Sequence, residues 1–289
     1  MENVLIITDS NSGISQKEAA SLGIKVIPMP FTINDTDYYE DVNLTNEQFY
    51  EKLKDKCEIH TSQPSPQVVL DIFEDAMEHY KEAVYIPMSS GLSSSYQTAV
   101  MLAEDFDDRV VVVNNKRISV TMKHSVMDAL KLANRGMSAK EIKKCLEEDS
   151  GNSSIYIMLE TLEYLKKGGR LTTAAAMLAQ LLKIKPVLQI QGDKLDAFSK
   201  VRTVSQAKSV MINQARKDIV NKFGCNENGK GVTIYSVYSN NYEAALSFKE
   251  DLQKAFPYAG VIIIDRLSLS ISCHIGPDSL AIAIVKNTY

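Results

Sequence analysis

Three continuous apolar runs in the first half of the chain limit its fold more than any other feature. The runs are Val4–Ile7, Ala83–Met88 and Val110–Val113, and none of them alternates apolar with polar residues. A strand that is apolar along its whole length is typical of a sheet covered on both faces. Helical segments such as Gln16–Leu22 and Gln67–Tyr80 stand between the runs. This order predicts an α/β fold with a mostly parallel sheet.

Hydroxyl-bearing residues gather directly after the second apolar run. The stretch Ser89-Ser90-Gly91-Leu92-Ser93-Ser94-Ser95 leads from this strand into a helix that includes Gln97–Ala103. Unsatisfied backbone N–H groups and the helix dipole favour an anion at such a point. Serines are equally common there as simple helix caps. The stretch alone therefore leaves an anion site and an ordinary capped helix both open.

A second pair of hydroxyls, Thr61-Ser62, stands in an extended segment before another helix. Pro64 and Pro66 forbid helix ahead of Ser65, which is the expected N-cap. An anion-facing role and a rigid connector fit this pair equally well.

Asp9 follows the first strand, at the carboxyl edge where open α/β sheets place their sites, and is either functional or a turn cap.

A polar stretch rich in chain-breaking residues, Asp149–Ser153, predicts a boundary between two domains, residues 1–152 and 153–289. A chain of 289 residues is comfortable for two domains. The C-terminal domain is expected to be the smaller one, with mixed α/β structure. Its segment Leu165–Leu171, Leu-Lys-Lys-Gly-Gly-Arg-Leu, has the lysines and glycines that end a helix.

The segment Thr172–Leu182 is unusually apolar for a helix. It contains Ala175, Met177 and Leu178, and its apolar residues run nearly all round. Such a helix is normally buried in a core. Small alanines and a flexible methionine would also line a narrow cavity well. Both interpretations remain open from the segment itself.

Composition excludes several classes of function. A net charge of −4 argues against a nucleic-acid partner held through phosphate neutralisation. No apolar run reaches the ~18 residues that span a bilayer, and no signal-peptide pattern fits the first residues. The four cysteines are scattered, which favours reduced thiols and a cytoplasmic protein. Cysteines and histidines lack metal-ligand spacing, so no metal or cofactor is expected.

Two functions fit the candidate residues. One is a serine hydrolase with Ser93, His274 and Asp9 as a triad. The other is a receptor in which hydroxyls, helix N–H groups and His274 hold the anionic head of a ligand. No G-x-S-x-G turn surrounds Ser93, and the chain has no P-loop. The residues therefore favour an anion-binding site, with the hydrolase as the alternative.

Six short motifs together resemble the DegV family of fatty-acid-binding proteins, the acyl-carrying subunits of bacterial fatty acid kinase. They occur in the family's order and spacing over essentially the whole chain: Thr8-Asp9-Ser10, Thr61–Ser65, Ser90–Ser93, Leu165–Leu171, Lys185-Pro186 and His274–Pro277. The resemblance implies a two-domain α/β fold with a long-chain fatty acid in a tunnel between the domains. It also implies a carrier in phospholipid metabolism rather than an enzyme, with at most transient membrane contact.

The resemblance implies roles for single residues as well. The carboxylate of the fatty acid would meet the hydroxyls at Thr61, Ser62 and Ser93, with Ser94 beside them, and the ring of His274. Ala175, Met177 and Leu178 are expected in the tunnel wall.

A kinase partner would phosphorylate the carboxylate to an acyl phosphate. Arg202 matches a family arginine needed for productive work with that kinase.

Two positions depart from the family pattern. Ser94-Ser95 stand where Gly-Thr is frequent, which alters the loop around the head group. Asp278 replaces a common glycine, which alters the backbone beside His274.

Overall fold

The computed structural model describes residues 2–55, 57–170, 172, 175 and 184–289. The chain divides into two compact units, Met1–Ser150 together with Tyr289, and Gly151–Thr288. The division predicted from the sequence stands between residues 152 and 153. No helix in the described part of the chain is long and apolar enough to cross a membrane.

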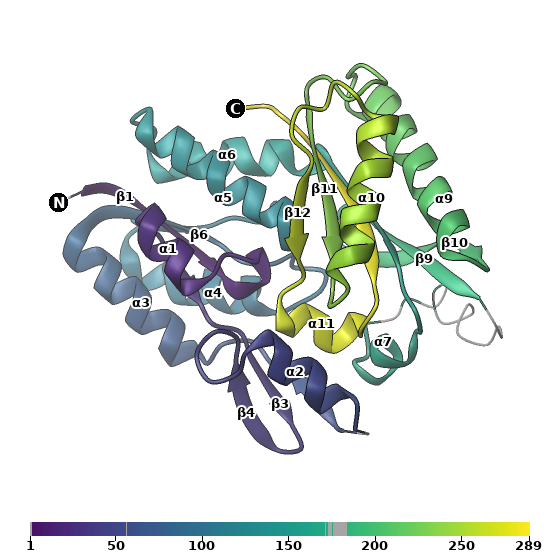
Figure 1. Cartoon of the computed structure of the whole chain (residues 1–289). Coiled ribbons are helices and arrows are strands. Elements are labelled where there is room, and N and C mark those ends of the chain that lie inside the picture. Colours follow the sequence, from purple (N-terminus) through teal and green to yellow (C-terminus); the bar gives the residue numbers. More distant parts are fainter. Residues whose placement is uncertain (1, 56, 171, 173–174, 176–183) are drawn as a thin grey trace. The chain divides into compact units, whose positions relative to one another are not determined.

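The first unit is built on a four-stranded parallel sheet with the order β2-β1-β6-β7 (Figure 1). The strands are β1 (Glu2–Asp9), β2 (Lys25–Ile27), β6 (Tyr80–Ile86) and β7 (Val110–Val112). The parallel sheet predicted from the apolar runs is therefore confirmed. Because β1 and β6 are central neighbours, the loops at their carboxyl ends emerge side by side.

Helices cover both faces of this sheet, which is why its strands are apolar throughout. Successive residues of one strand enter different cores: Ile6 packs with α1, α5 and α6, whereas Leu5 packs with α3 and α4 (Figure 1). The helices are α1 (Gln16–Leu22), α3 (Pro66–His79), α4 (Ser95–Ala103), α5 (Ser119–Asn134) and α6 (Ala139–Glu148). Three 3-10 turns complete the chain here: η1 (Ser10–Ser12), η2 (Glu104–Phe106) and η3 (Asp149–Gly151).

A small antiparallel sheet with the order β4-β3-β5 precedes α3. Its elements are β3 (Pro30–Ile33), β4 (Thr36–Tyr39), α2 (Asn46–Leu53) and β5 (Ile59–Thr61). Asn34 and Asp35 form the hairpin turn between β3 and β4, with φ of 48° and 60°, a conformation these residue types tolerate. Phe31 packs edge-on against Phe49 of α2, with ring centroids 5.7 Å apart. The strand β5, which ends at Thr61, pairs with β3 on the side opposite β4.

The second unit is built on a six-stranded mixed sheet with the order β10-β9-β8-β13-β11-β12. Among the described strands of this sheet, only the β11–β12 pair is parallel. The strands are β8 (Ser153–Met158), β9 (Lys185–Ile190), β10 (Leu195–Val201), β11 (Val232–Tyr238), β12 (Ile263–Arg266) and β13 (Leu280–Lys286). The second unit thus differs from the first, because most neighbouring strands in its sheet are antiparallel.

Two long helices, α9 (Val204–Lys217) and α10 (Tyr242–Ala255), pack on this sheet through Met211 and Phe248 (Figure 1). The sequence predicts one helix over Val204–Phe223, but the segment η4 (Asp218–Lys222) is a π-helical turn. Asp218 is buried there and accepts a hydrogen bond from the Tyr156 hydroxyl at 2.6 Å.

Two short helices, α7 (Glu163–Lys167) and α11 (Leu269–Ile275), pack against each other. The sequence did not predict α11. Of the apolar helix predicted over Thr172–Leu182, only Thr172 and Ala175 are described. Ala175 is buried, and its N–H donates to the Thr172 hydroxyl at 3.2 Å. Met177 and Leu178 lie outside the described residues.

Candidate functional site

The loop between β6 and α4, residues 87–94, is anchored at its start by Asp9. The Asp9 Oδ2 atom accepts a hydrogen bond from the Met88 N–H at 2.9 Å, and Oδ1 accepts one from the Asn11 N–H at 2.9 Å. The carboxyl group is fully buried, which raises its pKa from 3.8 to about 6 against the opposing effect of these donors. Asp9 therefore ties the ends of two neighbouring parallel strands together.

A second anchor comes from Arg117. Its backbone carbonyl accepts a hydrogen bond from the Ser89 N–H at 2.9 Å. Its guanidinium is buried and pairs with Asp149, with Nη2 2.7 Å from Oδ2. A buried, paired arginine holds its own backbone rigidly, and Ser89 is bonded to that backbone. The Ser89 carbonyl in turn accepts the N–H of Ser93 at 3.2 Å.

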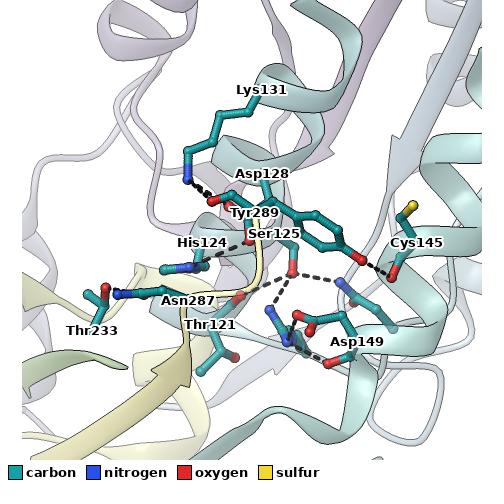
Figure 2. A network of polar contacts seen from close by, with 12 residues as sticks. Thr121, His124, Ser125, Asp128, Lys131, Cys145, Asp149, Thr233, Asn287 and Tyr289 are labelled. Carbon is teal, nitrogen blue, oxygen red and sulfur yellow. Dashed lines mark hydrogen bonds and ion pairs between the residues drawn. The ribbon is translucent and has the colours of Figure 1, made fainter. Parts of the chain in front are cut away.

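The Arg117 pair belongs to a larger polar network between α5 and α6, which Figure 2 shows. The Ser125 hydroxyl oxygen receives N–H groups from Arg117 at 3.0 Å and from Asn115 at 2.7 Å. Asp128 on the same helix is buried and accepts from Lys131 at 2.8 Å. The Tyr289 hydroxyl donates to the Cys145 carbonyl at 3.0 Å. The network gives the loop after β6 a fixed base.

Gln63 joins the two hydroxyl-rich segments. Its Oε1 atom accepts a hydrogen bond from the Ser94 hydroxyl at 2.9 Å and another from Thr98 at 3.1 Å. Gln63 follows Thr61 and Ser62 directly, so this amide places both predicted hydroxyl segments on one surface of the first unit. The sequence singled out both segments without identifying the contact between them.

Ser93 stands at the amino end of α4. Its Oγ lies 2.8 Å from Ser95 Oγ and accepts the Ser95 N–H at 3.2 Å. Ser94 is the N-cap residue by position, but its side chain makes no capping bond and turns to Gln63 instead. Ser93 is half-buried and Ser94 is exposed. Hydroxyls and backbone N–H groups therefore converge at this helix end, which suits an anion.

Thr61 is the last residue of β5, where it pairs with Phe31. The Ser62 N–H donates to the Pro30 carbonyl at 3.3 Å, which continues the extended path beyond the strand. Thr61 is half-buried, whereas Ser62 is exposed. Ser65 caps α3 as predicted, through its bond from the Val68 N–H at 3.3 Å.

In the second unit, His274 lies near the end of α11, with its ring against Gly168 at the end of α7. Burial, with a smaller contribution from the Arg170 charge, lowers the pKa of His274 from 6.5 to about 4. The imidazole is therefore neutral at pH 7. It offers one N–H donor and no positive charge.

Two further predicted positions are described in this unit. Arg202 is exposed, and its backbone N–H donates to Gln206 at 3.0 Å, just before α9. Asp278, one of the departures from the family pattern, has a φ of 56°. Its N–H donates to the Asn240 side chain at 2.7 Å, which holds the turn after α11.

The roles of the predicted residues thus differ. Both carboxylate oxygens of Asp9 accept hydrogen bonds from backbone N–H groups. This anchoring explains the position of Asp9 without the catalytic triad of the alternative hydrolase. No individual role was predicted for Gln63, Arg117 or Gly168. Gln63 and Gly168 lie inside two of the motifs that carry the family resemblance, but no contact of either residue was identified, and the glycines after α7 were otherwise interpreted as the end of a helix. No three His, Cys, Asp or Glu side chains gather as a possible metal site within the described ranges.

Comparison with known proteins gives matches along nearly the whole chain. The profile of the DegV family, described as uncharacterised protein, matches residues 3–287. A DegV domain-containing protein from Staphylococcus aureus is 27% identical over 286 residues, which cover 99% of this chain and 100% of the relative.

Two solved structures are also similar. A DegV family protein from Thermus thermophilus, described for its fatty acid binding, has a TM-score of 0.84 at 25% identity and covers 98% of this chain and 99% of its own. DegV from Bacillus subtilis, described as a fatty acid binding protein, has a TM-score of 0.85 at 25% identity, covering 99% and 100%.

Proposed function

This chain belongs to the DegV family, and on that premise we propose that it binds a long-chain fatty acid and presents it to a fatty acid kinase. The observation that carries the proposal is the bond from Ser94 to Gln63, because it collects the predicted hydroxyls at one helix start. The similar structures named as fatty-acid-binding support the class of ligand.

In this proposal the carboxylate is held by Thr61, Ser62, Ser93 and Ser94 of the first unit and by His274 of the second. Hydroxyls and a neutral imidazole donate hydrogen bonds to a carboxylate without needing a buried counter-charge. The amino end of α4 adds a favourable dipole. The three anchors of the loop, at Asp9, Arg117 and Gln63, preorganise the donors that this loop carries.

The acyl chain contributes most of the affinity. Burial of each methylene contributes ~0.8 kcal/mol, so a long chain gains on the order of 10 kcal/mol before costs. A hydrogen bond to a charged group is worth only ~1.5–3 kcal/mol. The chain is proposed to lie in an apolar tunnel whose wall includes Ala175, Met177 and Leu178. The hydroxyls then set the orientation of the ligand, and the tunnel sets its affinity.

The proposed role is that of a carrier and not of an enzyme. The kinase phosphorylates the bound carboxylate to an acyl phosphate, and the exposed Arg202 takes part in work with that kinase. Sealing the chain from water while leaving the head group accessible is what a carrier for a soluble kinase requires.

Extraction of the purified protein with organic solvent, followed by mass spectrometry, tests the ligand class. We expect a stoichiometric long-chain fatty acid. Displacement of a fluorescent fatty acid analogue then gives affinities, since the chain contains no tryptophan for intrinsic indole fluorescence. Absence of any acyl lipid in the extract, together with no displacement by oleate, would contradict the proposal.

A coupled assay with ATP, oleate and a fatty acid kinase catalytic subunit tests the partner. Acyl phosphate is trapped by hydroxylamine as a hydroxamate. Arg202→Ala is expected to bind oleate normally and to lose phosphorylation. Arg135→Ala, which removes an exposed arginine at the end of α5, is the matched control. Equal rates for the two variants would remove Arg202 from the kinase contact.

A further inference from the structure

The ends of α7 and α11 fit together through a glycine on each side. Gly168 follows α7, and a methyl group placed on it would overlap the His274 ring, lying 2.7 Å from Cε1 and closer still to Nδ1. Carbon atoms in ordinary contact stand about 3.5–4.0 Å apart. The imidazole of His274 therefore occupies the space that any side chain at position 168 would fill.

The second contact is reciprocal. Gly276 follows α11, and a methyl group there would lie 2.5 Å from Cδ2 and 2.7 Å from Cε2 of Tyr164 on α7. Gly276 has φ of 76° and ψ of −178°, a backbone conformation that is essentially restricted to glycine. The Gly168 N–H donates to the Tyr164 carbonyl at 2.9 Å. The last turn of α7 thus supplies the Tyr164 ring, which lies against Gly276, and the space at Gly168 that the His274 ring fills.

We propose that Gly168 is a positioning residue, which turns the Nδ1 edge of His274 into the protein and directs Nε2–H toward the carboxylate of the fatty acid. The part that concerns the carboxylate rests on the proposed function. The placement of the ring is a property of the second unit by itself.

Two properties of the imidazole support this assignment. Nδ1 is fully buried, at the edge of the ring that faces Gly168. A neutral imidazole carries a single N–H, on one nitrogen or the other. Only the tautomer with its proton on Nε2 donates from the edge opposite Gly168. A side chain at position 168 would push the ring out of this place and misdirect the donor.

Nitrogen-15 NMR of histidine-labelled protein tests the placement directly, because the two tautomers have distinct ring-nitrogen shifts. In ligand-free protein we expect His274 in the Nε2–H form, and added oleate should shift the Nε2 signal. Gly168→Ala should lose the single tautomer and weaken oleate binding by about tenfold or more, the value of one misplaced hydrogen bond to a charged group.

Gly169→Ala is the matched control. It changes the neighbouring glycine, whose φ is +67°, but a methyl group there meets nothing within 4 Å. This variant should bear backbone strain and still keep the tautomer and the oleate affinity. In a His274→Ala background, Gly168→Ala should no longer weaken oleate binding, because the overlapping ring is absent.

The outcomes separate the two hypotheses. An Nδ1–H tautomer in the ligand-free wild type overturns the positioning role, and this holds even if Gly168→Ala does not fold. Unchanged tautomer and affinity in Gly168→Ala overturn it as well. An Nε2–H tautomer that oleate does not perturb, with full oleate binding by His274→Ala, leaves the positioning intact and contradicts the carboxylate contact of the proposed function.

Discussion

The Ser94 hydroxyl lies 2.9 Å from Gln63 Oε1, and this bond connects two segments that are 31 residues apart in the sequence. Thr98 donates to the same oxygen from the next turn of α4. A single amide oxygen therefore holds the amino end of a helix against the segment that carries Thr61 and Ser62. The proposed head-group site depends on this contact.

Gln63→Ala should weaken oleate binding while costing only about 1–2 kcal/mol of stability, because it removes two partly exposed hydrogen bonds, from Ser94 and Thr98. Oleate affinity is measured by displacement, and stability by urea unfolding. Gln67→Ala, which removes an exposed amide bonded to Asp71 on α3, is the control and should leave oleate affinity unchanged. Gln63→Glu keeps the acceptor oxygen but adds a negative charge near an anion, so it should also bind oleate less tightly. If both Gln63 variants bound oleate as tightly as the wild type and Gln67→Ala, Gln63 would be excluded from the site.

Asp149→Ala should destabilise the first unit strongly, because it leaves the buried Arg117 charge without its carboxylate partner. Removing one member of a buried ion pair costs about 3–5 kcal/mol. The exposed pair of Lys140 with Asp108 offers a comparison, and Lys140→Ala should cost no more than about 1 kcal/mol. Urea unfolding at pH 7 measures both. A small loss for Asp149→Ala would mean that Arg117 reaches another partner or water.

The pKa of Asp9 predicts a specific pH dependence. Burial raises this pKa from 3.8 to about 6, so between these values the folded protein holds a proton that the unfolded chain has released. Stability contributed by this group is therefore present at low pH and is lost as the pH rises through about 6. Over the whole titration the loss amounts to about 3 kcal/mol, at 1.36 kcal/mol per pKa unit, and most of it falls between pH 4 and pH 7.

Asp9→Asn removes this titration and leaves the other acids in place. The difference in free energy of unfolding, wild type minus variant, should fall as the pH is raised from 4 to 7. Urea unfolding at several pH values measures it. A flat or rising difference would contradict the raised pKa and hence the desolvated environment of the carboxyl group.

Ser93→Ala should still retain bound oleate, with its affinity lowered by about tenfold for the loss of one hydrogen bond, because the tail supplies most of the affinity. It should impair phosphorylation of the bound oleate, because the hydroxyl orients the head. Ser21→Ala, an exposed serine on α1, is the control. If binding vanished while phosphorylation per bound oleate stayed normal, this division of roles would be wrong. A fluorophosphonate probe tests the alternative hydrolase, because rapid labelling of Ser93 would favour an enzyme.

Ala175→Leu should change which fatty acids the protein retains, because Ala175 is fully buried and extra methyl groups have to take space from a neighbour. Shorter acyl chains should be enriched in the organic extract, as measured by mass spectrometry. Ala20→Leu, at an exposed alanine of α1, should leave the lipid profile unchanged. An unchanged profile for Ala175→Leu would place this residue outside the tunnel wall.

The parallel sheet could be predicted because its signal is local. The run Val4–Ile7 is apolar on both faces, and the structure covers both faces of β1 with helices. The hairpin turn at Asn34-Asp35 and the capping box of α2, in which Thr45 and Gln48 each accept a hydrogen bond from the other's backbone N–H, have equally local signals. In each case neighbouring residues alone determine the conformation.

The missed features depend on distant partners. The α11 sequence Leu-Ser-Ile-Ser-Cys-His-Ile alternates apolar and polar residues like a strand, yet it is helical where it packs against α7. Two contacts join the ends of these helices: the His274 ring lies against Gly168, and the Tyr164 ring lies against Gly276. In each contact the ring and the glycine are more than one hundred residues apart in the sequence, so local propensity could not reveal it. Gln63 was missed for the same reason, since its bonds to Ser94 and Thr98 join segments with no shared local pattern.

The three anchors of the loop after β6 have a consequence for biosynthesis. Asp9, Gln63 and the Arg117–Asp149 pair come from four distant parts of the first unit, and Asp149 lies near the end of its main segment, Met1–Ser150. A nascent chain still attached to the ribosome cannot fix Ser93 in place until Asp149 has emerged from the exit tunnel. Acquisition of the proposed fatty acid should therefore not precede the synthesis of Asp149, and truncated translation products that stop before Asp149 should be empty.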